Sequence, residues 1–106
     1  NLYVRHDKLN NCIDLVLSSW DYGTELEHRW TDIDEELLQE LDEAQSERDG
    51  QWCFEVLTRA VSDYLHLAPL TDQDIERLTK VAVLCDPPIA SVITERGRHS
   101  FIRLHN

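Results

Sequence analysis

Residues 51–68 read QWCFEVLTRAVSDYLHLA, a stretch in which apolar side chains outnumber polar ones. The apolar residues fall on several sides of a helix, which is typical of a helix that packs against more than one neighbour. Pro69 follows at once and ends the helix, because proline has no N–H to donate. The stretch therefore predicts a central helix over residues 50–68, around which the rest of the chain packs.

Helices are also predicted on the two sides of the central one. Residues 31–45 open with a capping-box pattern, in which Thr31 caps the first turn and Asp34 reaches back to it. Residues 71–86 open in the same way, with Thr71 as the cap, and two prolines follow this stretch. Both stretches place apolar residues on one side of the predicted helix.

A fourth helix is predicted over residues 7–20, where apolar side chains recur at intervals of three and four. Asp7 stands where it can cap the first turn, and Gly23 stands where it can end the last one. The apolar stripe consists of Leu9, Cys12, Ile13, Val16, Leu17 and Trp20. This spacing is that of a helix with one buried face.

The tail, residues 89–105, has two interpretations. Pro88 can open a short helix, or residues 91–94 and 100–104 can form the two strands of a hairpin. β-branched residues in the first strand and alternation in the second favour the hairpin. Two strands alone are marginally stable, and residues 2–5 are a candidate for a third strand.

The length and composition are those of one globular domain, with 106 residues, of which 42% are hydrophobic and 29% charged. We therefore expect residues 1–106 to form a single, mainly α, small four-helix domain with a possible C-terminal β-hairpin, which makes it α+β only at the margin. No apolar run reaches the ~18 residues that a membrane-spanning helix requires, so no such helix is expected.

Three cysteines stand at positions 12, 53 and 85, each within an apolar pattern and far from the other two. Zinc sites need close Cys or Cys/His pairs, and phosphate-binding loops need clustered glycines. Neither pattern is present, so the sequence predicts no metal and no cofactor. Isolated buried thiols are typical of a reducing compartment, which predicts a cytoplasmic protein.

The net charge of −11 is distributed unevenly along the chain. Residues 21–76 contain 17 carboxylates and three arginines, whereas residues 77–106 contain five Lys or Arg and two carboxylates. Proteins that bind nucleic acids or anionic membranes need clustered basic residues. We therefore expect this protein to contact neither directly. An acidic surface favours a basic protein partner and raises the rate at which the two proteins meet.

The stretch 31–45 carries acidic residues opposite its apolar ones, with no Lys or Arg between them. Close carboxylates on one helix repel each other, and a neighbouring tryptophan is typical of protein-binding sites. The candidate partner-binding residues are Trp30, Asp32, Glu35, Glu36, Gln39, Glu40, Asp42 and Glu43.

This acidic strip predicts a non-catalytic protein-interaction module, such as an adaptor, inhibitor or assembly protein. In a sharper version of the hypothesis the carboxylates imitate nucleic-acid phosphates, so that the protein acts as a DNA mimic. The plain alternative is that the acidity serves solubility alone.

An enzymatic alternative comes from residues 59–66, RAVSDYLH, in which Arg59 and His66 are separated by six residues. The pair resembles the arginine–histidine signature of HEPN-type ribonucleases, which are small helical bundles. The resemblance implies a helical ribonuclease whose Arg59 and His66 lie in a cleft formed with a partner subunit.

A third alternative is a structural subunit of a larger assembly or a homo-oligomer. In this hypothesis the tail adds to the sheet of a neighbouring subunit. The residues that would make this contact are Ile93, Phe101, Ile102 and Leu104.

Overall fold

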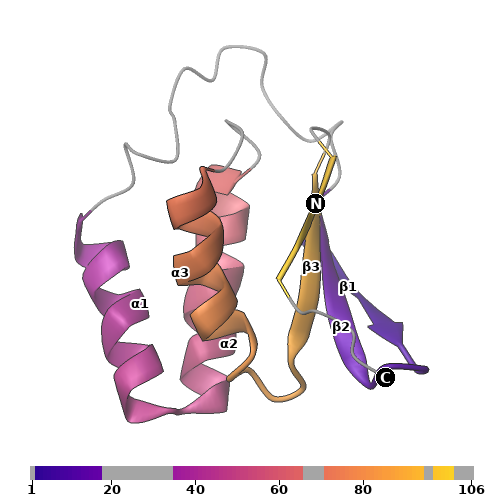
Figure 1. Ribbon diagram of the computed structural model, residues 1–106, viewed down its shortest axis with the longest axis horizontal. Coiled ribbons are helices and arrows are strands. Elements are labelled where there is room, and N and C mark those ends of the chain that lie inside the picture. The colour runs from indigo at the N-terminus through magenta and orange to yellow at the C-terminus, as the bar shows by residue number, and fades with distance from the viewer. Residues whose placement is uncertain (1, 18–34, 66–70, 95–96, 102–106) are drawn as a thin grey trace.

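The computed structural model describes residues 2–17, 35–65, 71–94 and 97–101, and within them the fold is α+β. Three α-helices form one layer, and a four-stranded sheet forms the other (Figure 1). Along the chain the elements are β1 (Leu2–Asp7), β2 (Cys12–Leu17), α1 (Glu35–Glu47), α2 (Gly50–Ala60), the π-helical turn η3 (Val61–Leu65), α3 (Asp72–Ala82), β3 (Ile89–Thr94) and β4 (Gly97–Ser100).

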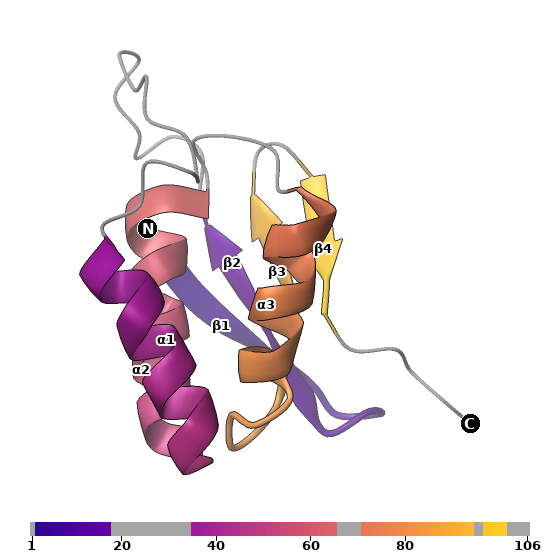
Figure 2. The same ribbon diagram turned by 60° about the vertical axis from the view of Figure 1, so that its left-hand side comes forward.

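The sheet consists of two hairpins that lie side by side in the order β1-β2-β3-β4. Pairing is antiparallel within each hairpin and parallel between β2 and β3. Parallel neighbours need a long connection that crosses the sheet, and this connection contains all three described α-helices. Figure 2 shows the helices lying across one face of the sheet.

The prediction of a four-helix domain is wrong, because the helix expected over residues 7–20 is a β-hairpin in its described part. Asp7 does cap a turn, but the turn is that of the hairpin. Its carboxylate accepts the backbone N–H groups of Leu9 at 3.1 Å and Asn10 at 3.3 Å. Asn11 adopts a positive φ of 51°, which asparagine tolerates better than most residues.

The apolar residues of 7–20 have the spacing of a helix because β2 is buried on both of its faces. Ile13, Leu15 and Leu17 point into the core between sheet and helices. Cys12 and Asp14 lie on the other face and are also buried. A strand with two buried faces reads as a nearly continuous apolar run, so its residues also satisfy a helical pattern.

The hairpin predicted in the tail is present, and the short helix is not. β3 pairs with β4 in antiparallel register, and the second strand begins at Gly97 rather than at residue 100. The strand predicted at residues 2–5 belongs to the same sheet, as part of β1. Phe101 is buried in the chain's own core, so it is not available to a neighbour's sheet. Ile102 and Leu104 lie outside the described residues.

The helices of residues 50–68 and 71–86 are present. The first continues through η3 as far as Leu65, beyond which residues 66–68 lie outside the described residues, and the second ends at Ala82, four residues earlier than predicted. Asp49 caps α2 by accepting the N–H groups of Gln51 and Trp52, each at 3.1 Å. The predicted capping box at the start of α3 is confirmed, with both of its hydrogen bonds at 3.2 Å. No described helix is long and apolar enough to span a bilayer.

The helix predicted over residues 31–45 is described from Glu35 onwards, as α1. Residues 31–34, which include the proposed cap Thr31, lie outside the described residues. α1 ends two residues later than predicted, at Glu47, and Arg48 follows it with a positive φ of 54°. This tight turn brings α2 back against α1.

The core lies between the helical layer and one face of the sheet. Its fully buried side chains include Leu15, Leu41, Leu57, Leu78, Ile89 and Val92. The prediction of three buried cysteines is confirmed, and none of them forms a disulfide. Burial raises the pKa of the Cys85 thiol to about 12, so this thiol stays protonated and unreactive at neutral pH.

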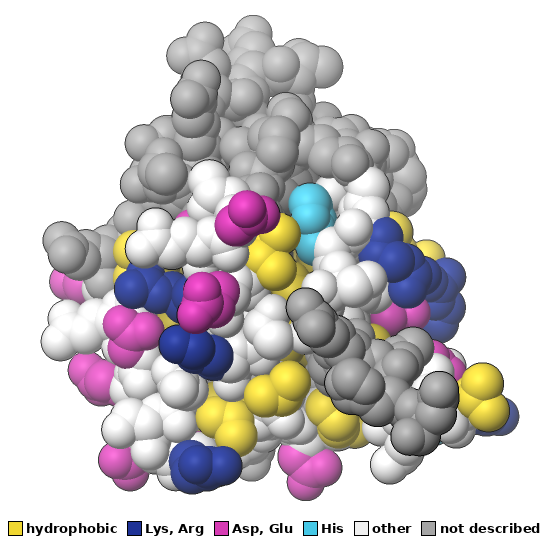
Figure 3. All heavy atoms as spheres, viewed as in Figure 1, with side chains coloured by type: hydrophobic (Ala, Val, Ile, Leu, Met, Phe, Trp, Pro, Cys, Tyr) yellow, Lys and Arg dark blue, Asp and Glu magenta, His cyan; other side chains and the backbone are white. Residues whose placement is uncertain are grey.

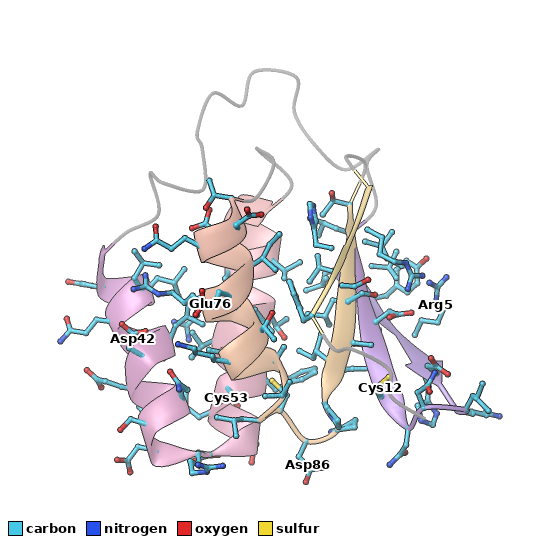
Figure 4. The ribbon with its side chains drawn as sticks, in the orientation of Figure 1. Arg5, Cys12, Asp42, Cys53, Glu76 and Asp86 are labelled. Carbon is cyan, nitrogen blue, oxygen red and sulfur yellow. The ribbon has the colours of Figure 1, made fainter. Side chains whose placement is uncertain are left out.

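A polar cluster on the outer face of the sheet, the side turned away from the helices, takes one residue from each strand. Asp14 of β2 is buried and accepts a 2.6 Å hydrogen bond from the hydroxyl of Ser91 in β3. Arg5 of β1 donates to the same carboxylate at 3.2 Å, and Arg98 of β4 lies 3.9 Å from it. Figure 4 shows Arg5 pointing away from the helices. The cluster connects all four strands.

Substitution Gly50→Ala is expected to destabilise the protein, although alanine is usually the better helix residue by ~1 kcal/mol. A Cβ atom on Gly50 would lie 2.9 Å from the carbonyl oxygen of Leu84 and 3.1 Å from Cβ of Asp86. Such overpacking costs about 1–3 kcal/mol of unfolding free energy, measurable by urea denaturation. The neighbouring exposed change Gln51→Ala is the control and should cost less than about 0.5 kcal/mol. A more stable Gly50→Ala variant would contradict this account.

Candidate functional site

The two layers of the fold differ in charge. Described residues 35–65 and 71–82, which form the helical layer, contain twelve carboxylates and four Lys or Arg. The hairpins (residues 2–17, 89–94 and 97–101) contain three Lys or Arg and two carboxylates. In Figure 3 carboxylates spread over the helical side, and a cluster of basic side chains lies towards the sheet. Among the described residues, the acidity predicted from the sequence therefore belongs mainly to the helical layer.

The structure describes only part of the predicted acidic strip. Trp30 and Asp32 lie outside the described residues, and of Glu35 only the backbone, at the start of α1, is described. The remaining five are all in α1, where Glu40 is half-buried and the others are exposed: Glu36, Gln39, Glu40, Asp42 and Glu43.

Glu40 is used inside the molecule. Its carboxylate accepts a 2.9 Å hydrogen bond from the indole Nε1 of Trp52 and a 2.8 Å bond from Nη1 of Arg59. These bonds, that of the indole foremost, lower the pKa of Glu40 below its usual value. Glu40 therefore holds α1 against α2 and is not available to a partner as a free charge.

Asp42 also lies near a cation of the chain itself. Its Oδ1 is 3.7 Å from Nε of Arg77, which comes from α3. Within α3, Oε1 of Glu76 lies 3.8 Å from Nζ of Lys80. Figure 4 shows Asp42 and Glu76 on facing helices, where they border a polar hollow of about 240 Å³. The strip is thus crossed by basic side chains from the neighbouring helices.

A second hollow, of about 350 Å³, lies where α1 turns into α2. Glu43, Ser46, Glu47 and Trp52 line it. Glu43 and Glu47 are one helical turn apart and therefore share a face of α1. Both are exposed, and within the described residues no Lys or Arg pairs with either of them. We call these four residues the Trp52 hollow.

The Trp52 ring is held in place at the wall of this hollow. It is half-buried and packs against the core, and its hydrogen bond to Glu40 orients the indole. An aromatic face attracts Lys and Arg side chains, and the two nearby carboxylates attract the same groups. The hollow therefore has the chemistry of a site for a basic side chain.

Sequence reasoning found the acidic helix but not this hollow. It selected Trp30 as the aromatic neighbour of the carboxylates, and it omitted Ser46, Glu47 and Trp52. The hollow could have been predicted from the short break between the two helices at residues 48–50. A connection this short makes the two helices antiparallel neighbours, so that Trp52 packs back against the end of α1.

Of the two residues of the ribonuclease alternative, the structure describes only Arg59. The guanidinium of Arg59 is paired with Glu40, which raises the pKa of Arg59, and His66 lies outside the described residues. The helical bundle that the HEPN resemblance implies is replaced by an α+β fold. The structure therefore adds no support to this alternative.

No group of three or more His, Cys, Asp or Glu side chains in the described ranges is placed to hold a metal ion. Comparison with protein-family models, with curated proteins and with solved structures found no match. The candidate site consequently depends on its own geometry and charge.

Substitution Trp52→Phe is expected to lower stability by about 1 kcal/mol at neutral pH, since it removes a hydrogen bond to a charged, partly exposed group. The hydrogen bonds from Trp52 and Arg59 lower the pKa of Glu40 in the folded protein. The stabilisation is therefore fully present above the usual pKa of a glutamate and is lost as the pH falls through the lowered folded-state pKa. Urea denaturation at neutral and acidic pH measures the difference.

In a Glu40→Gln background, Trp52→Phe should cost the same at both pH values, because the titrating partner is gone. A pH-independent loss in the otherwise native protein would show that the indole serves packing alone.

Proposed function

We propose that this protein is a non-catalytic interaction module that binds a basic surface of another protein through its helical layer. The twelve carboxylates and four Lys or Arg of that layer support this proposal. An acidic surface attracts a basic partner over about 10 Å at moderate ionic strength and raises the rate of encounter.

The observation that carries the proposal is the Trp52 hollow. A Lys or Arg side chain of the partner would enter it, with its charge near Glu43 and Glu47 and its stem against the indole. A cation–π contact contributes about 0.5–2 kcal/mol, and each exposed carboxylate adds roughly 0.2–1 kcal/mol. Because Glu40 already fixes the indole, little conformational freedom would be lost on binding.

This geometry favours a discrete anchor over imitation of a nucleic acid. A phosphate mimic presents a continuous row of free charges, whereas Arg59 and Arg77 interrupt the row on α1. An anchored surface of this kind is compatible with an adaptor, inhibitor or assembly role. The three buried, unbridged cysteines support a place in a reducing compartment such as the cytoplasm.

The test is an NMR titration of the isotope-labelled protein with an arginine-rich peptide as a stand-in for the partner. The indole N–H signal of Trp52 should shift most, together with the amide signals around Glu43 and Glu47. The double variant Glu43→Gln/Glu47→Gln should bind roughly tenfold more weakly, as expected for the loss of two favourable charges.

The control variant Glu55→Gln/Asp63→Asn removes the same net charge from exposed positions that do not line the hollow. It should weaken binding about threefold or less, through long-range attraction alone. Equal losses in the two double variants would mean diffuse attraction and would overturn the anchor. Absence of peptide binding at low salt would overturn the function itself.

A further inference from the structure

The strand β1 (Leu2–Asp7) forms one edge of the described sheet. It pairs with β2 along its inner side, and no other described strand pairs with its outer side. Tyr3 and Val4 are each 53% exposed, which is high for large apolar side chains on a strand. The strand contains no Pro or Lys, which commonly protect edges from pairing. Its charged residues Arg5 and Asp7 are engaged within the hairpin, with Asp14 and with the turn respectively. The outer side of β1 is therefore suited to accept another strand.

The backbone groups that β1 presents outwards belong to alternate residues. The N–H of Ile13 bonds to the carbonyl of Pro88, so Ile13 faces away from β1. Its partner in β1, His6, consequently turns its own N–H and C=O outwards. The same holds for Val4 and Leu2, because the pattern repeats every second residue. The outward groups are therefore centred on Val4.

This arrangement is self-complementary about a two-fold axis through Val4. In an antiparallel pair of two β1 strands, Val4 stands opposite Val4 of the second copy, and Leu2 stands opposite His6. Each of these pairs exchanges its outward hydrogen bonds. Tyr3 then stands opposite Arg5, on the outer face, where ring and guanidinium attract each other. A shift of this register by one residue in each copy would instead place Arg5 opposite Arg5.

An apolar hollow of about 280 Å³ lies beside the edge, on the helical side of the sheet. Val4, Ile13, Phe54 and Pro87 line it together with two polar residues. In the paired arrangement the Val4 side chain of the second copy would point to this same side, next to the hollow. Burial of such surface stabilises association by roughly 25 cal/mol per Å².

We propose that two copies of this chain associate through β1, forming one continuous eight-stranded sheet with Val4 on the two-fold axis. The helical layers of both copies then lie on the same side, because the axis is perpendicular to the sheet. Two acidic layers repel each other, and added salt screens that repulsion. Dimer formation should therefore strengthen with salt, whereas binding of a basic partner at the Trp52 hollow should weaken.

Sedimentation velocity over about a hundredfold concentration range tests the proposal. The native chain should pass from monomer to dimer, with the midpoint at lower concentration in higher salt. Val4→Pro removes an N–H that faces away from β2, a change that edge strands tolerate, and should weaken the dimer at least tenfold. Val4→Thr keeps the N–H and the β-branched shape, and should dimerise like the native chain.

Charge pairs test the register. Val4→Lys and Val4→Glu should each be monomeric, because like charges meet on the axis, and an equimolar mixture should form a heterodimer. Circular dichroism checks that each variant is folded. A native chain that stays monomeric throughout, a Val4→Pro variant that dimerises normally, or a mixture that stays monomeric would each overturn the proposal.

Discussion

One buried carboxylate connects the whole sheet. The carboxylate of Asp14 accepts a 2.6 Å hydrogen bond from the hydroxyl of Ser91, which lies 77 positions later in the chain. The guanidinium groups of Arg5 and Arg98 lie beside the same carboxylate. A buried charge is tolerated only when it is hydrogen-bonded and paired, so the four strands must be in register before Asp14 is satisfied. The parallel pairing of β2 with β3 in turn fixes the place of the three helices, since they form the connection between these strands.

The local signals in the sequence predicted three helices and the C-terminal hairpin, but they indicated a helix where the structure has the N-terminal hairpin. Capping of α3 by Thr71 depends on neighbouring residues and was predictable. The N-terminal hairpin depends on β3, which covers one edge of β2, and on helices that cover one of its faces. Residues such as Leu15 then become fully buried, and the alternation that identifies a strand disappears. Asp7 added to the error, because its side chain satisfies N–H groups equally well in a turn and at a helix start.

The candidate site shows the same limit. The acidic character of α1 could be predicted from composition, but which carboxylates remain available depends on neighbours that are distant in sequence. Arg59 and Arg77, from α2 and α3, engage Glu40 and Asp42. Trp52 reaches Glu40 across twelve positions, because the turn after α1 reverses the chain. Contacts of this kind follow from the packing of the helices and cannot be predicted from a local sequence pattern.

Within the described residues, the segregation of charge between the two layers produces an electric dipole moment, with its negative end on the helices. In the field of a positively charged protein such a dipole experiences a torque, so the helical layer would turn towards that protein before the surfaces touch. The sheet would then face the opposite direction during the approach. Orientation at a distance and contact at short range would thus favour the same pose, and β1 would remain accessible in it.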